Sequence, residues 1–167
     1  MRHVSYSFRF AEEVLNSRLA IKQEVERVIG DLRYEKDHLS RPGFNKRLRD
    51  LLVPLGWADQ PEVFAEQDDV GARMDFLKER VGMEVGFGHA SFLGIDLLKF
   101  QVSSYSSLDK IDIGIYITTT REFQKYAQTE FVQNWEGSLT FEKVTRYLPH
   151  FKSAIQVPIW VIGIDRR

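Results

Sequence analysis

The chain has 167 residues, of which 43% are hydrophobic and 28% charged, and its formal net charge is -1. This is the length of one globular domain, so we expect residues 1–167 to form a single domain, and 12 Phe, 6 Tyr and 3 Trp residues argue against disorder. The absence of Cys excludes disulfides, thiolate metal sites and a cysteine nucleophile. The near-neutral charge excludes a uniformly basic nucleic-acid coat but allows a focused basic face. The sequence has no apolar run long enough for a membrane span and no signal-peptide core, so a cytoplasmic protein is expected.

The first sixty residues are predicted to be helical. Asn16-Ser17 interrupts an apolar stripe and is expected to cap a second helix that begins there. Another helix is predicted from about Pro42 to Val53, with Ser40 as its N-cap. The stripe, with a spacing near 3.6 residues, consists of Ala11, Val14, Ile21, Val25, Val28 and Leu32.

The pattern changes after an acidic, irregular stretch at 58–71. Two strands are predicted next, and the second alternates strictly between apolar and other residues. The last strand is a nearly continuous apolar run, which suits a central position in the sheet. Together these elements predict an α/β domain. The predicted strands are 73–78, 80–87, 111–118 and 157–164, and the predicted helices are 91–101, 121–128 and 139–148.

The hairpin at 73–87 brings two carboxylates together. If Glu79-Arg80 is a two-residue turn, Asp75 lies opposite Glu84 on the same face of the sheet. Like charges so placed are unfavourable unless a cation lies between them, and two carboxylates with water are typical Mg²⁺ ligands. The register is an assumption, because the turn lacks Gly, Asn and Asp. The alternative is two exposed carboxylates on a wetted sheet face.

Three segments of the sequence, in order, are MDFLKERVGMEVGFGHASF, DKIDIGIYI and VPIWVIGI. They resemble the BglII/BstYI-like type II restriction endonucleases of the PD-(D/E)XK nuclease superfamily. The resemblance covers residues 72–118 closely, 155–164 well and the N-terminal helices loosely. It implies a restriction-endonuclease-like α/β fold, in which helices flank a mixed central sheet.

The resemblance also implies a function, which is Mg²⁺-dependent, sequence-specific cleavage of double-stranded DNA at a short palindromic site. Asp75 and Glu84 match the two catalytic, metal-binding carboxylates, and the carbonyl of Val85 matches a third metal ligand. A homodimer and a cognate methyltransferase that protects host DNA are implied as partners.

One position departs from the family pattern. Relatives have Lys or Gln two residues after the glutamate, whereas this chain has Gly86. In the relatives, that side chain helps to position or activate the attacking water. Here another residue can fill this role, with Lys78, His89 and Lys99 as candidates, or metal and water alone can suffice at a lower cleavage rate. A DNA-binding pseudonuclease with weakened or lost cleavage is the third possibility. An unrelated reading is an interaction domain with an incidental acidic hairpin.

Polar and basic residues outside the hairpin are candidate DNA contacts. His89 follows the second strand and either contacts DNA or is a surface or capping residue. Ser91 is interpreted as a helix cap or a base contact. Lys46 and Arg47 belong to the densest basic cluster, which either contacts phosphates or is simply solvated. The full set of predicted DNA contacts is His89, Ser91, Lys46, Arg47, Lys110, Gln133 and Asn134.

The predicted helix at 91–101 is apolar on more than one side. A helix of this kind is buried all round, so a dimer interface or a thick intrachain core must cover the extra face. The resemblance favours the dimer. The apolar residues are Phe92, Leu93, Ile95, Leu97, Leu98 and Phe100.

Overall fold

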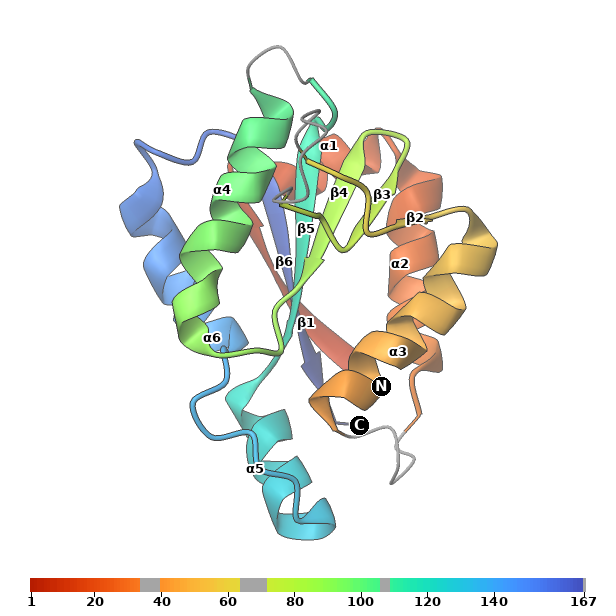
Figure 1. Cartoon of the computed structure of the whole chain (residues 1–167), viewed down its shortest axis with the longest axis vertical. Helices are drawn as coiled ribbons and strands as arrows, with labels where there is room; N and C mark the ends of the chain where they lie inside the picture. The colour runs from red at the N-terminus through yellow and green to blue at the C-terminus, as the bar shows by residue number, and fades with distance from the viewer. Residues whose placement is uncertain (34–39, 64–71, 106–108, 167) are drawn as a thin grey trace.

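A six-stranded mixed sheet forms the centre of the computed structural model, which describes residues 1–33, 40–63, 72–105 and 109–166 (Figure 1). The strand order is β1-β6-β5-β4-β3-β2. β4, β5 and β6 run parallel, whereas the other neighbouring pairs are antiparallel. The predicted fold class, a mixed sheet flanked by helices, is confirmed. The strands are β1 (Arg2–Phe8), β2 (Ala58–Asp59), β3 (Phe76–Lys78), β4 (Val81–Val85), β5 (Ile113–Thr119) and β6 (Ile159–Asp165).

Helices cover both faces of this sheet (Figure 1). α1, α2, α3 and α5 pack on one face, and α4 and α6 pack on the other. No helix in the described ranges is long and apolar enough to cross a membrane. The α-helices are α1 (Ala11–Asn16), α2 (Leu19–Asp31), α3 (Arg41–Leu52), α4 (Leu93–Ser104), α5 (Arg121–Phe131) and α6 (Phe141–Tyr147). The 3-10 helices are η2 (Val53–Leu55), η3 (Ala90–Phe92) and η5 (Leu148–Phe151).

The interior strands β5 and β6 are buried along their whole lengths, as the apolar run of β6 predicted. Strand alternation sends successive side chains to opposite layers. Ile115 and Ile117 therefore join the layer under α1–α3, whereas Tyr116 points to the layer under α4. This alternation brings Tyr116 to the face on which the candidate site forms.

The helical prediction for the first sixty residues is wrong at the N-terminus. Residues 2–8 form β1, which pairs with β6 from Arg2↔Asp165 to Phe8↔Ile159. β1 is an edge strand in which only Phe8 is fully buried, and its polar residues give it no clear apolar run. Without β1, the buried strand β6 would lack a hydrogen-bonding partner on one side.

The predictions for the helices after β1 agree more closely with the structure. The stripe at 11–32 forms α1 and α2, with a break at 17–18, but Ser17 does not cap α2 because its hydroxyl donates to the Val14 carbonyl at the end of α1. Ser40 caps α3 as predicted, since its Oγ accepts a hydrogen bond from the Gly43 amide at 3.2 Å. α3 is thereby fixed at its start, near the site described below.

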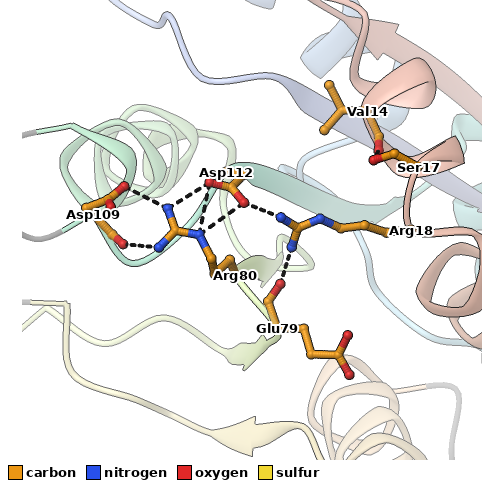
Figure 2. Close-up of polar contacts among 7 residues, drawn as sticks. All are labelled: Val14, Ser17, Arg18, Glu79, Arg80, Asp109 and Asp112. Carbon is orange, nitrogen blue, oxygen red and sulfur yellow. Dashed lines mark hydrogen bonds and ion pairs between the residues drawn. The ribbon is translucent and has the colours of Figure 1, made fainter.

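Charged side chains stabilise the turn between β3 and β4. Glu79 and Arg80 have φ angles of 45° and 65°, the left-handed region that type I′ hairpin turns require and that Gly or Asn usually occupies. Figure 2 shows Arg18 donating hydrogen bonds to the Glu79 carbonyl and to Asp112. Arg80 donates to both carboxylate oxygens of Asp112 and, at 2.6 and 2.7 Å, to the carbonyl and carboxylate of Asp109. The turn is thus held from the α1–α2 junction and from the segment before β5.

Candidate active site

The register of the β3–β4 hairpin is the one predicted. Lys78 pairs with Val81, and the pairing continues to Phe76↔Met83, so the next position places Asp75 opposite Glu84. Asp75 Oδ2 accepts a hydrogen bond from the amide of Val85 at 2.7 Å, which fixes its carboxylate beside the second strand.

Both carboxylates line one pocket of about 370 Å³. Its walls come from α3, the hairpin and the segment after it, η3, α4, β5 and the loop before α6, so residues from 45 to 139 build it. The lining residues are Asn45, Asp75, Glu84, Val85, Gly86, Gly88, His89, Phe92, Ile95, Asp96, Lys99, Tyr116 and Leu139.

Glu84 is a buried carboxyl with an incomplete set of partners. Its side chain is 2% exposed, and its Oε1 has no hydrogen-bond partner. Burial and the charge of Asp75 raise the pKa of Glu84 to about 9, although Lys99 opposes the shift. Burial also raises the pKa of Asp75, against the hydrogen bond from Val85. The pair therefore favours a proton or another cation between its oxygens.

α4 supplies a lysine and an aspartate to this pair. Asp96 and Lys99 are three residues apart and thus on the same helix face. Lys99 Nζ lies 2.7 Å from Glu84 Oε2, 3.1 Å from Asp96 Oδ1 and 3.1 Å from the Arg73 carbonyl. Burial lowers the pKa of Lys99, but the charges of Glu84 and Asp96 outweigh it and the net shift is upward. The group remains an ammonium.

Tyr116 occupies the space beside Gly86. In the parallel β4–β5 pairing Tyr116 is the partner of Glu84, and its hydroxyl donates to Asp96 Oδ2 at 2.9 Å. A β-carbon at position 86 would meet that hydroxyl and lie 2.6 Å from both Cε1 and Cζ of the ring, well inside contact distance. Position 86 therefore tolerates only glycine while Tyr116 keeps this orientation.

Of the three candidates for the role left open at Gly86, only Lys99 contacts a hairpin carboxylate. Lys78 bonds to Glu24 at 2.8 Å and to the Leu55 carbonyl at 2.7 Å, away from the pocket. His89 is exposed at the pocket rim, where its Nδ1 lies 2.9 Å from the Ser91 hydroxyl.

A family model described as restriction endonuclease BglII/BglIII matches residues 3–164. The chain belongs to this family. It is therefore a sequence-specific DNA endonuclease of the type II site-specific deoxyribonuclease class, as the resemblance implied. No individually curated protein matches its sequence.

Two crystal structures of BglII are among the solved structures that share this fold. The crystal structure of restriction endonuclease BglII complexed with a DNA 16-mer has a TM-score of 0.79 and 21% identity, over 100% of this chain and 78% of that one. The crystal structure of free BglII has a TM-score of 0.69 and 20% identity, over 100% of this chain and 81% of that one.

Divalent metal use is general in this family of endonucleases. In the described part of the chain, no group of three or more His, Cys, Asp or Glu side chains is arranged to hold a metal ion. An ion between Asp75 and Glu84 would thus need the Val85 carbonyl, water or phosphate oxygens as further ligands. The unpartnered Glu84 Oε1 fits such a site, because a buried oxygen without a donor can accept a cation.

Of the residues predicted to contact DNA, His89 lines the endonuclease pocket and Ser91 is hydrogen-bonded to it. His89 caps η3 by accepting from the Ser91 amide at 3.3 Å, so the cap is His89 and not Ser91. Gln133 and Asn134 begin the loop before α6. That loop runs alongside His89, through hydrogen bonds of 3.3 Å between Ala90 N and Gly137 O and 2.9 Å between Leu139 N and Gly88 O.

The three basic candidates are arranged differently. Lys46 and Arg47 lie on α3, next to the pocket residue Asn45, and Lys46 pairs with Asp50 at 3.0 Å. Lys110 Nζ donates to the carbonyls of Glu62 and Val63, at 2.8 and 3.0 Å, so it ties two segments of the endonuclease together.

Sequence reasoning did not single out Asn45, Asp96 or Tyr116. Two signals were present. A glycine inside a strand indicates close approach of another group, which is what Tyr116 does at Gly86. The i, i+3 spacing of Asp96 and Lys99 indicates an ion pair on α4.

We expect Gly86→Ala to destabilise the endonuclease by about 1–3 kcal/mol, because the new methyl group overlaps the Tyr116 ring. In a Tyr116→Val background the same change should cost less than about 0.5 kcal/mol. Urea unfolding of the four proteins measures this coupling. Gly30→Ala is the matched control, since a β-carbon there meets nothing within 4 Å. Equal costs in the two backgrounds would contradict the packing argument.

We expect Glu84→Gln to raise the stability of the metal-free protein, by an amount that grows with pH. The folded pKa of about 9 lies above the usual 4.5, so the native state keeps a proton that the unfolded chain releases. Wild type therefore loses stability between about pH 4.5 and 9, and the variant does not. The expected advantage is about 1–3 kcal/mol at pH 8.5 relative to pH 5.5.

Urea unfolding in EDTA at both pH values measures this difference. Glu24→Gln is the control, because Glu24 also pairs with a lysine, and removing that contact should only weaken the fold. A pH-independent difference between wild type and Glu84→Gln would contradict the burial argument.

Proposed function

We propose that Asp75, Glu84 and the Val85 carbonyl bind Mg²⁺ and form the catalytic centre, and that residues 1–167 act as one PD-(D/E)XK-type nuclease domain. The observation that carries this is the carboxylate pair of the partly buried Asp75 and the buried Glu84, in which Glu84 Oε1 has no hydrogen-bond partner. With all groups ionised, the three pocket carboxylates and the Lys99 ammonium leave a formal charge of about −2. A divalent cation neutralises that charge.

The reaction is hydrolysis of a DNA phosphodiester. A bound metal ion would polarise the phosphate and make a coordinated water more acidic. The water oxygen bonds to phosphorus, the P–O bond to the leaving oxygen breaks, and the proton lost by water is matched by one gained by that oxygen. Asp75 is oriented by the Val85 amide and Glu84 by Lys99, so both carboxylates are positioned before DNA arrives.

We propose that a second copy of the chain covers the outer face of α4. Leu93, Leu97 and Phe100 are buried against the sheet, whereas Leu98 is 50% exposed; Phe92 and Ile95, which are 60% and 59% exposed, also line the pocket. This apolar strip continues into a hollow of about 190 Å³ that Phe151 and Ile155 help to line. A two-fold contact would present one pocket to each strand of a palindromic site.

The DNA face would surround the pocket. His89 lines the pocket with Ser91 beside it, and Gln133 and Asn134 begin the loop whose residues 137–139 run alongside His89, so that their imidazole, hydroxyl and amide groups would contact base edges or phosphates. Lys46 and Arg47, on the neighbouring α3, would contact the phosphate backbone. Lys110 is left out of this set because its ammonium is engaged within the fold.

A restriction enzyme works in the compartment that holds DNA. We therefore place this one in the cytoplasm, with a cognate methyltransferase that modifies the same site. Digestion of a sequenced plasmid in Mg²⁺, followed by mapping of the ends, would give the site that both proteins recognise.

Asp75→Ala should lower plasmid cleavage by more than about a hundredfold, because the phosphate loses its electrostatic stabilisation. Specific DNA binding in Ca²⁺, followed by gel shift, should persist. Asp59→Ala is the matched control, since Asp59 is an acidic residue on the neighbouring strand β2, outside the pocket. Wild-type cleavage by Asp75→Ala would refute the site assignment. Binding without cleavage by the unmodified protein would indicate a pseudonuclease.

Leu98→Asp should convert the dimer to a monomer without unfolding it, because the side chain is half exposed within one protomer. Light scattering at micromolar concentration should give about twice 19.5 kDa for wild type and 19.5 kDa for the variant. Leu19→Asp is the control, since Leu19 is also 50% exposed but lies on α2, on the opposite face of the sheet. A monomeric wild type, with and without DNA, would rule out the two-fold arrangement.

A further inference from the structure

Gly86 leaves the site without the side chain that normally stands two residues after the glutamate. Tyr116 fills that volume with an aromatic ring, and its hydroxyl is committed to Asp96. A substitute must therefore reach the pocket from another element. The ammonium of Lys99 is in the pocket already, 2.7 Å from Glu84.

We infer that Lys99, on α4, is the third catalytic residue of this endonuclease, and that its ammonium contacts the attacking water and the scissile phosphate in place of a side chain at position 86. The inference rests on the proposed roles of Asp75 and Glu84.

Two contacts hold the ammonium independently of what Glu84 binds. The Arg73 carbonyl and Asp96 Oδ1 each lie 3.1 Å from Lys99 Nζ, and neither is a proposed metal ligand. The lysine side chain is also only 14% exposed, so little freedom remains in its long stem. Lys99 is thus preorganised at the pocket wall, as a group that stabilises developing charge must be.

Asp96 and Tyr116 are positioning residues in this arrangement. Tyr116 donates to one oxygen of Asp96, and the other oxygen contacts Lys99. The substitution of glycine at position 86 and the relocation of the cation to α4 are therefore linked. The glycine admits the tyrosine, the tyrosine orients the aspartate, and the aspartate orients the lysine.

Lys99 keeps its proton throughout the reaction. It donates a hydrogen bond to the water oxygen or to a non-bridging phosphate oxygen and offsets negative charge as the P–O bond to water forms. The proton released by that water passes to solvent, and the leaving oxygen takes one from solvent. No proton is gained or lost at Lys99.

A purely structural role for Lys99, as the counter-ion of Glu84, predicts a different result. Loss of a counter-ion changes the affinity of the carboxylate pair for metal, so it moves the Mg²⁺ concentration at half-maximal rate. Loss of a catalytic group lowers the single-turnover rate even at saturating Mg²⁺. The plateau rate is therefore the decisive quantity.

The experiment compares Lys99→Met with Lys78→Met. Both lysines are largely buried and pair with a glutamate, at 2.7 Å for Lys99 and 2.8 Å for Lys78, but Lys78 lies outside the pocket. Single-turnover plasmid cleavage is measured over a Mg²⁺ titration for each protein, with thermal unfolding and DNA binding in Ca²⁺ as checks on integrity. If Lys99→Met does not fold, Lys99→Gln, which keeps a hydrogen-bond donor, takes its place.

We expect the plateau rate to fall by about a hundredfold in Lys99→Met and less than threefold in Lys78→Met, with DNA affinity retained. A fall of less than tenfold in the Lys99 variant overturns the inference. The Asp75→Ala variant distinguishes a wrong role for Lys99 from a wrong assignment of the metal site. If Asp75→Ala is inactive while Lys99→Met cuts normally, only the role of Lys99 is wrong. If both cut normally, the site assignment itself is wrong.

Discussion

The register of the β3–β4 hairpin is the constraint on which the site depends. A slip of one residue would turn Asp75 to the opposite face of the sheet and separate it from Glu84. The turn that sets this register has two non-glycine residues in the left-handed region, each of which costs about 1–3 kcal/mol. The contacts of Arg18 and Arg80 with Asp112 offset that cost. Charges at the turn thus determine the geometry of a pocket at the other end of the hairpin.

The arrangement of charges in the site lowers the stability of the metal-free fold. The buried Glu84 and the partly buried Asp75 repel each other, and one oxygen of Glu84 lacks a donor, so the metal-free fold would be more stable with a neutral residue at position 84. Lys99 compensates only in part, because it is shared between Glu84 and Asp96. Such local conflicts are expected at functional sites, where the missing partner is a ligand and not a side chain.

The elements that could be predicted from the sequence are those with a local sequence pattern. The alternation of residues 80–87, together with an assumed two-residue turn, predicted that Asp75 faces Glu84, and the apolar run of β6 predicted a central strand. β1 escaped because its partner β6 lies more than 150 residues away in the sequence. The choice among Lys78, His89 and Lys99 also depends on where α4 packs, and the Gly86–Tyr116 contact depends on the parallel register of β4 and β5. Neither the packing of α4 nor the register of β4 and β5 produces a periodic pattern in the sequence.

α4 combines packing on the sheet, the proposed subunit contact and the proposed catalytic lysine. Successive residues of a helix point about 100° apart, so Leu97 packs on the sheet, Leu98 points to solvent and Lys99 points into the pocket. The proposed two-fold contact would bear on the outer face of the same rigid element that carries Lys99. A partner subunit that shifts α4 would therefore move the ammonium relative to Glu84, which couples assembly on a palindromic site to the arrangement of the catalytic groups. In a protein where the third side chain came from β4, that coupling would be absent, because the group would move with the carboxylates.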